Sequence, residues 1–136
     1  MSYQWDASLE TGHEKIDNQH KQLISTLNSL VAASREGKDK EEIFKVLDFL
    51  SEYTILHFQA EEFLQLQYDY PDYYVHKEYH DDFKKTVVEL NKRLIELGPT
   101  PEMINKVASI IGEWFIQHIK GDDFRMAAFV KSKEKS

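Results

Sequence analysis

The hydrophobic positions of the chain recur every three or four residues in four separate stretches. This spacing puts them on one face of an α-helix, so the pattern predicts four amphipathic helices. In chain order, the predicted inward-facing stripes are Ile16, His20, Leu23, Leu27 and Leu30; Ile43, Val46, Leu47, Leu50, Thr54, His57, Glu61 and Leu64; His76, His80, Phe83, Val87, Leu90, Leu94 and Leu97; and Ile104, Val107, Ile111, Trp114 and His118. No stretch has the strict alternation that is typical of a β-strand.

Helix-breaking and helix-capping residues separate the four stretches. The first stretch ends near Gly37, and Asp39 begins a capping-box pattern for the second. Pro71 then interrupts the helical pattern, and Asp72 can cap the third stretch. A Gly-Pro pair ends that stretch, and Thr100, followed by proline, is a suitable cap for the fourth.

Four helices with short connections predict an all-α fold, an antiparallel up-down-up-down four-helix bundle with a short N-terminal leader. The 136 residues have the size of one domain with a single core. We expect residues 1–15 to form the leader, 16–123 the helical bundle, and 124–136 a C-terminal tail, whose last stretch, KSKEKS, is frayed and solvated.

Composition narrows the possible functions. The net charge of −7 argues against a nucleic-acid surface, because no basic stripe is available to contact phosphates. The absence of cysteine excludes disulfides, thiolate metal sites and cysteine nucleophiles. No secretory signal or membrane-spanning stretch is visible, so we expect a cytoplasmic protein without a membrane partner. The acidic composition and the short tail favour a monomer.

Histidine occupies stripe positions where leucine is expected. Five of the six histidines lie there, namely His20, His57, His76, His80 and His118, and only His13 falls outside, in the leader. One buried histidine is more often a hydrogen-bonded core residue than a metal ligand. Five in one apolar interior would leave ring nitrogens unsatisfied, at roughly 1–3 kcal/mol each. A metal resolves this problem, because it takes one ring nitrogen while the other donates a hydrogen bond outward.

The spacing of these residues favours two ions rather than one. His76 and His80 lie one helical turn apart, and His57 and Glu61 repeat that spacing with a carboxylate. Imidazole with carboxylate suits iron better than zinc, calcium or magnesium. Two six-coordinate ions have twelve positions, of which five imidazoles, two bridging carboxylates and one shared solvent oxygen fill eleven. The remaining position could take a small external ligand.

The second carboxylate is either Asp122 or Asp123. In a regular helix Asp122 is better aligned with His118, whereas Asp123 is rotated ~140° from it. Asp123 could reach the site only if the helix loosens at Gly121, where glycine tolerates unusual dihedral angles. The pattern alone slightly favours Asp122.

Four segments together identify a resemblance. DNQH, HFQAEE, YPDYYVHKEYH and HIKGDD occur in this order and at the spacing of a bundle. On the basis of these four segments, the chain resembles the hemerythrin family, and most closely its single-domain bacterial members. The resemblance covers nearly the whole chain. The resemblance implies a non-haem di-iron centre, with two iron ions bridged by an oxo or hydroxo group and two carboxylates. It assigns His76, His80 and His118 to one iron, His20 and His57 to the other, and Glu61 and Asp123 to the bridges.

The resemblance also implies reversible binding of O2, for storage, delivery or sensing. Nitric oxide, peroxide or azide-like anions could occupy the same open position. We expect Phe58, Trp114, Phe115 and Ile119 to line the O2 pocket, although ordinary core packing would place them similarly, and Phe115 is bulkier than the leucine expected there. The alternatives are a di-iron peroxidase or NO/peroxide scavenger at the same site, and a non-catalytic metal-binding or partner-binding bundle. Histidine-rich ligation favours reversible binding over oxidative chemistry.

Overall fold

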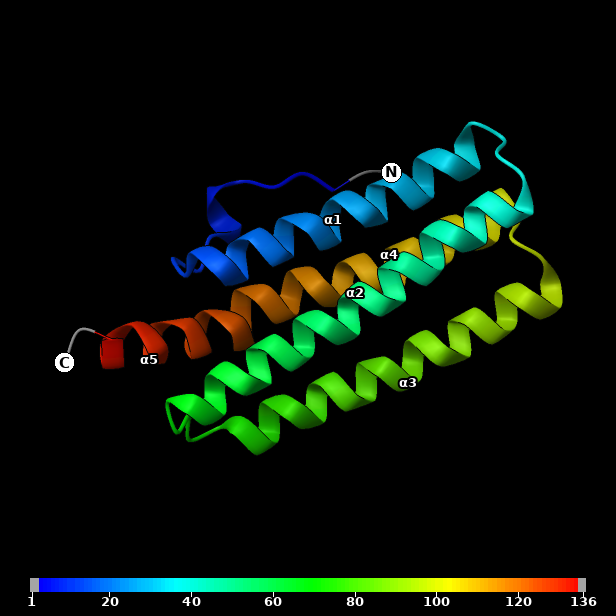
Figure 1. Cartoon of the computed structure of the whole chain (residues 1–136). Coiled ribbons are helices and arrows are strands. Elements are labelled where there is room, and N and C mark those ends of the chain that lie inside the picture. The colour runs from blue at the N-terminus through cyan, green and yellow to red at the C-terminus, as the bar shows by residue number, and fades with distance from the viewer. Residues whose placement is uncertain (1–2, 135–136) are drawn as a thin grey trace.

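Four long antiparallel helices form the body of the molecule (Figure 1), in a computed structural model that describes residues 3–134. They are α1 (Glu14–Arg35), α2 (Lys40–Gln67), α3 (Tyr73–Leu97) and α4 (Pro101–His118). Helix α2 packs against α1 and α3, and α4 closes the bundle against α1 and α3. The predicted four-helix bundle is therefore confirmed, and no strand occurs among residues 3–134. Within the same residues, no helix combines the length and the apolar character that crossing a membrane requires.

The predicted helix caps are correct in position, with one difference in detail. Asp39 accepts a hydrogen bond from the backbone N–H of Glu42 at 2.9 Å, and Thr100 accepts one from Met103 at 3.2 Å. Asp72 also stands at the N-cap of α3, but its side chain makes no capping hydrogen bond. Its backbone, with φ −98° and ψ 22°, lacks the extended conformation that aims a cap side chain at the following N–H groups.

The predicted stripes form the interior, and they divide it into two halves along the bundle. The half away from the α2–α3 turn is an apolar core that contains Leu27, Leu30, Leu47, Leu94 and Ile104, each at most 2% exposed. Leu97 was expected to continue this stripe but is 66% exposed. It is the last residue of α3, so the buried stripe ends one turn earlier, at Leu94. The half near the α2–α3 turn holds the histidines.

The N-terminal leader packs along helix α1 (Figure 1). Tyr3 exchanges two backbone hydrogen bonds with the Asn28 side chain, at 2.8 and 2.6 Å. Its ring also lies against α4 at Gly112, where an added Cβ would come within 2.4 Å of it. A short 3₁₀ turn, η1 (Ala7–Leu9), then buries Leu9. The leader therefore covers the helices that carry two of the histidines.

Residues 124–136 were predicted as a tail outside the helical bundle, but the structure places residues 124–134 in a helix that packs against the bundle. Residues Ile119–Asp123 form a π-helical turn, η2, and Phe124–Glu134 continue as helix α5. Met126, Ala127 and Val130 of α5 are fully buried, and Met126 and Val130 pack with Ile16 and Tyr70. The apolar stripe of α5 thus closes the end of the bundle that contains the histidines. Residues 135–136 lie outside the described residues.

Truncating Met126 tests whether α5 belongs to the folded core. We expect Met126→Ala to lower the free energy of unfolding by about 2–5 kcal/mol, the usual cost of deleting a buried methionine side chain. Urea unfolding followed by circular dichroism measures this, with the exposed Ser132→Ala on the same helix as control. Equal stability of the two variants would show that α5 contributes no packing energy.

Candidate metal centre

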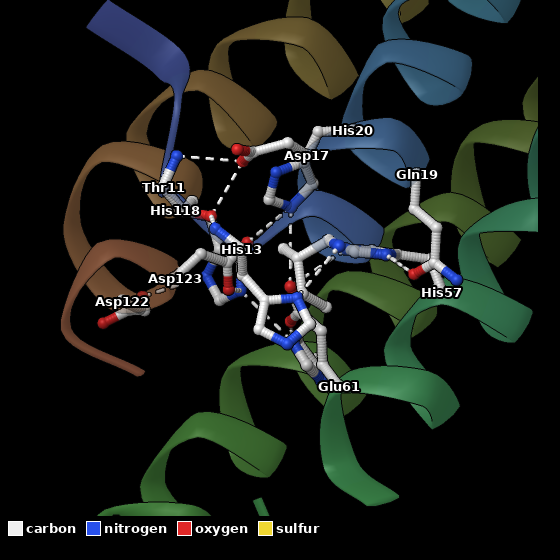
Figure 2. Close-up of polar contacts among 12 residues, drawn as sticks. Thr11, His13, Asp17, Gln19, His20, His57, Glu61, His118, Asp122 and Asp123 are labelled. Atoms are coloured by element: carbon white, nitrogen blue, oxygen red, sulfur yellow. Dashed lines mark hydrogen bonds and ion pairs between the residues drawn. The ribbon is translucent and has the colours of Figure 1, made fainter. Parts of the chain in front are cut away.

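Five histidine side chains from four helices converge in the interior of the bundle, in the half near the α2–α3 turn. They are His20 on α1, His57 on α2, His76 and His80 on α3, and His118 at the end of α4, each at most 4% exposed. All five direct the same ring atom, Nε2, towards two buried carboxylates, those of Glu61 and Asp123. Figure 2 shows His20, His57 and His118 around these two acids. The five imidazoles thus share one orientation, with Nε2 inward and Nδ1 outward.

Glu61 lies at the middle of the cluster. Its Oε2 lies 3.0 Å from Nε2 of His57 and 3.4 Å from Nε2 of His20. Its Oε1 lies 3.1 Å from His80 and 3.3 Å from His76 on the other side. The two carboxylate oxygens therefore face two different sets of histidines, as a bridging carboxylate would.

The two carboxylate oxygens of Asp123, like those of Glu61, face different histidines of the cluster. Its Oδ2 lies 2.8 Å from Nε2 of His20, and its Oδ1 lies 3.0 Å from His76 and 3.2 Å from His118. Asp122, which the regular-helix pattern favoured, lies outside the cluster: its Oδ2 meets the outward Nδ1 of His118 at 2.9 Å. It also pairs with Arg125.

A π-helical turn explains why Asp123, and not Asp122, faces the cluster. A π-helix closes on the fifth residue instead of the fourth, so the residue at i+5 comes back under the residue at i. The turn Ile119–Asp123 begins directly after His118 and contains Gly121. It brings Asp123 to the inner side and leaves Asp122 at the edge. Because π-turns are rare, a helical periodicity of 3.6 could not predict this placement.

The cluster divides into two groups with the size and composition of cation sites. One contains Glu61, His76, His80, His118 and Asp123, and the other contains His20, His57, Glu61 and Asp123. Within each group the ligand-type atoms lie within 4.8 Å of one another, and all the residues are buried. Glu61 and Asp123 belong to both groups. His13 belongs to neither, since its Nδ1 instead accepts the N–H of Ile16 as the cap of α1.

The polar atoms of the cluster fit a cation better than they fit one another. Nε2 of His20 and His57 and all four carboxylate oxygens of Glu61 and Asp123 are buried and have no directed hydrogen bond to any of residues 3–134, despite their short separations. Nε2 of His118 lies 3.1 Å from Nε2 of both His76 and His80. Neutral imidazoles that share protons could not satisfy all of these atoms, which cost about 1–3 kcal/mol each when orphaned. Metal ions at the centre would satisfy them together.

The acids also control how the metal-free histidines titrate. Burial acts to lower the pKa of His20, but the close negative charges of Asp123 and Glu61 outweigh it and raise the pKa to about 9. The same balance raises the pKa of His118 to about 10. His57 differs, because burial dominates there and lowers its pKa. Burial would raise the pKa of Glu61, but the surrounding histidines hold it well below its usual range.

Metal binding should therefore release protons. With their pKa values raised from 6.5 to about 9 or 10, His20, His76 and His118 carry protons at pH 7 in the metal-free protein. A metal binds only the deprotonated nitrogen, so loading with a divalent cation at pH 7 should release at least one proton per ion. Calorimetry in buffers of different ionisation enthalpy measures this number. A binding enthalpy that is independent of the buffer would contradict the prediction.

Three side chains support the histidines from outside, and the sequence analysis did not identify them in this role. Nδ1 of His57 lies 2.7 Å from Oε1 of Gln19, and Nδ1 of His80 lies 2.8 Å from Oε2 of Glu62. Asp122 serves His118 in the same way. Gln19 and Glu62 directly adjoin site residues in the chain, but no periodic pattern distinguishes such neighbours from ordinary surface residues.

The four side chains predicted to line an O2 pocket lie around the cluster on different sides. Phe58 stacks on His80 with ring centroids 3.9 Å apart, and Trp114 stacks on His118 at 4.4 Å. Phe115 is buried in contact distance of Phe58, whereas Ile119 packs with Leu9 and Ile24 in a separate cluster. Trp5 of the leader also lies beside the cluster, with its ring centroid 6.5 Å from that of His20, and no periodic pattern in the sequence indicated this position.

Known proteins show the same combination of fold and sequence. The family described as "Hemerythrin HHE cation binding domain" matches residues 11–130. The bacteriohemerythrin of Stenotrophomonas maltophilia is 32% identical over 128 residues, which cover 94% of this chain and 81% of the relative. The myohemerythrin of Theromyzon tessulatum is 31% identical over 123 residues, which cover 90% and 89%.

A solved structure agrees with these sequence matches. Wild-type hemerythrin superposes with a TM-score of 0.82 at 25% identity, covering 94% of this chain and 97% of that one. The match extends over the bundle and the segments that carry the histidines, and the family model spans all seven residues of the cluster. The chain therefore belongs to the hemerythrin family.

Proposed function

We propose that this protein binds O2 reversibly at two iron ions held by the buried histidine–carboxylate cluster. His76, His80 and His118 would hold one ion, His20 and His57 the other, and Glu61 and Asp123 would bridge them. The observation that carries this proposal is the pair of overlapping groups that share both acids and divide the histidines three to two. With both acids bridging, the group with two histidines has one ligand fewer, so the external ligand would bind there.

The composition of the cluster supports reversible binding. Histidine supplies five of the seven ligand-type side chains, and these are neutral when they bind a metal. Sites that activate O2 for oxidation in other four-helix bundles are richer in carboxylates. When bound, two ferrous ions would supply the two electrons that O2 takes up and returns. The neutral imidazoles limit the charge that the apolar interior must accommodate.

The side chains around the cluster would keep water and protons away from it. Phe58, Phe115 and Ile119 are at most 3% exposed, and Trp114 covers the His118 ring. Apolar walls of this kind hinder the proton delivery by which bound oxygen is lost in a reduced form. Phe58 and Trp114 stack on His80 and His118 of the three-histidine group. Trp5 lies beside His20, and Ile119 packs in the same apolar cluster as Trp5 and Leu9 of the leader. We propose that both walls contribute to this exclusion.

Optical spectra of the iron-loaded protein test the proposal. The anaerobically reduced protein should be nearly colourless, gain a charge-transfer band in air, and lose it again under argon over repeated cycles. Metal analysis should find two irons per chain. Rapid turnover of hydrogen peroxide with a reductant, without a stable oxygenated form, would favour the peroxidase or scavenger instead. One zinc and no iron would contradict both functions.

A further inference from the structure

The hydrogen-bond partners outside the cluster divide by charge between the two groups of histidines. In the three-histidine group, His80 faces the carboxylate of Glu62 and His118 faces that of Asp122, at 2.8 and 2.9 Å. In the two-histidine group, His57 faces the neutral amide of Gln19 at 2.7 Å. Nδ1 of His20 is buried and has no hydrogen-bond partner within residues 3–134. Both outer negative charges therefore support the same group.

An outer carboxylate changes a metal-bound imidazole more than an outer amide does. Because all five histidines turn Nε2 inward, each Nδ1–H is free to donate outward. Donation to a carboxylate makes the imidazole a more basic ligand, and the added negative charge favours the higher oxidation state of the metal. Donation to the Gln19 carbonyl oxygen orients His57 without adding charge.

We infer that Glu62 and Asp122 make the ion at His76, His80 and His118 the more easily oxidised of the two, while the ion at His20 and His57, whose outer partner Gln19 is neutral, is the harder to oxidise. This inference rests on the proposed di-iron function and adds to it an unequal division of redox potential. Glu62, Asp122 and Gln19 act as positioning residues through the histidines. The ion with the open position would thereby be the second of the two to lose its electron.

The two carboxylates are not equivalent. The side chain of Asp122 is 21% exposed and is shared between His118 and the exposed Arg125, whose positive charge offsets part of its effect. The side chain of Glu62 is 12% exposed and contacts His80 directly. Solvent screens it less, so Glu62 should have the larger influence.

The test compares isosteric charge changes on the two sides of the cluster. Glu62→Gln removes an outer charge from the three-histidine group, and Gln19→Glu adds one to the two-histidine group. Gln19 borders a surface cleft with Asn18 and Gln22, which leaves room for solvent beside the new carboxylate. Gln59→Glu, an exposed position on α2, controls for the change in net charge alone. Urea unfolding of each iron-loaded variant shows whether it remains folded.

The readout is the pair of one-electron potentials of the iron-loaded protein, measured under argon by spectroelectrochemistry with soluble mediators. We expect Glu62→Gln to raise the lower potential and Gln19→Glu to lower the higher one. Each change should be at least tenfold in the ferric-to-ferrous ratio, about 59 mV for one electron. Both variants should therefore narrow the separation of the two potentials. Asp122→Asn should act like Glu62→Gln but less strongly, and Gln59→Glu should leave the separation unchanged.

The outcomes distinguish this inference from the proposed function. If Gln19→Glu lowers mainly the lower potential, or Glu62→Gln raises mainly the higher one, the unequal division is wrong even though the protein binds O2. If the potentials move as expected but no reversible oxygenated form exists, the division stands and the carrier function fails. A chain that holds fewer than two irons refutes both.

Discussion

Replacing Asp123 by asparagine is expected to remove most of the bound iron, whereas the same replacement of Asp122 should leave two irons per chain. Asp123 is fully buried, and its two oxygens face histidines of both groups. Losing one member of a buried charged set costs about 3–5 kcal/mol, which corresponds to a more than 100-fold loss of metal affinity. Among the residues of the cluster, Asp122 contacts only His118, at its outer nitrogen, where a loss of about 10- to 100-fold is usual and excess iron can overcome it.

The two asparagine variants are matched in chemistry and adjacent in sequence, so each is the control for the other. Iron per chain is measured after anaerobic loading and gel filtration in the presence of a weak chelator. Circular dichroism confirms that both variants remain helical. Should Asp122→Asn lose the iron while Asp123→Asn keeps it, the regular-helix alignment would be right and the π-turn placement of the acids wrong.

Removing the metal should destabilise the whole bundle by at least about 4 kcal/mol at metal concentrations a thousandfold above the dissociation constant. The physical cause is the buried cluster, whose carboxylate oxygens and inward nitrogens lose their common partner. The interior cannot rearrange to satisfy them, because they come from every long helix and from the turn after α4. Protonation of His20, His76 and His118 recovers only part of the loss, since three imidazolium ions then remain in an apolar core.

Urea unfolding of the iron-loaded and the chelator-treated protein at pH 7 measures this difference. The apolar half of the bundle should remain the more protected part in hydrogen exchange, because Leu30, Leu94 and Ile104 are fully buried there in an apolar core. Equal unfolding midpoints with and without metal would mean that the histidines are satisfied by one another and that the cluster is not a metal centre.

The bundle and its inward residues could be predicted because both follow from helical periodicity. A residue such as Leu30 or Ile104 is buried whenever its helix forms and presents its apolar stripe to the others. His57, His80 and His118 were predicted to be buried for the same reason, since they occupy the same periodic positions as these residues. Histidines on four inward stripes must then lie close together in the interior of the bundle. The candidate metal centre could therefore be predicted from the sequence.

The remaining features depend on contacts between segments that are distant in the chain. The sequence did not indicate that Glu62 would reach His80, eighteen residues away, or that Gln19 would reach His57 on another helix. The burial of α5 was missed for a similar reason. Its stripe of Met126 and Val130 is short and follows a glycine, and only the position of Ile16 and Tyr70 gives it a surface to cover.

Helical periodicity is enough to predict that four amphipathic helices bury five histidines and Glu61, because the direction of a side chain from a regular helix depends only on its position. Periodicity did not predict that Asp123 joins them, which the family resemblance assigned, or that Gln19 and Glu62 support the histidines from outside. Asp123 lies on the inner side because a π-helical turn replaces a regular turn after His118. The π-helical turn directs Asp123 towards the histidines of the other helices. Such a departure is stabilised by contacts across the bundle, and local periodicity carries no information about them.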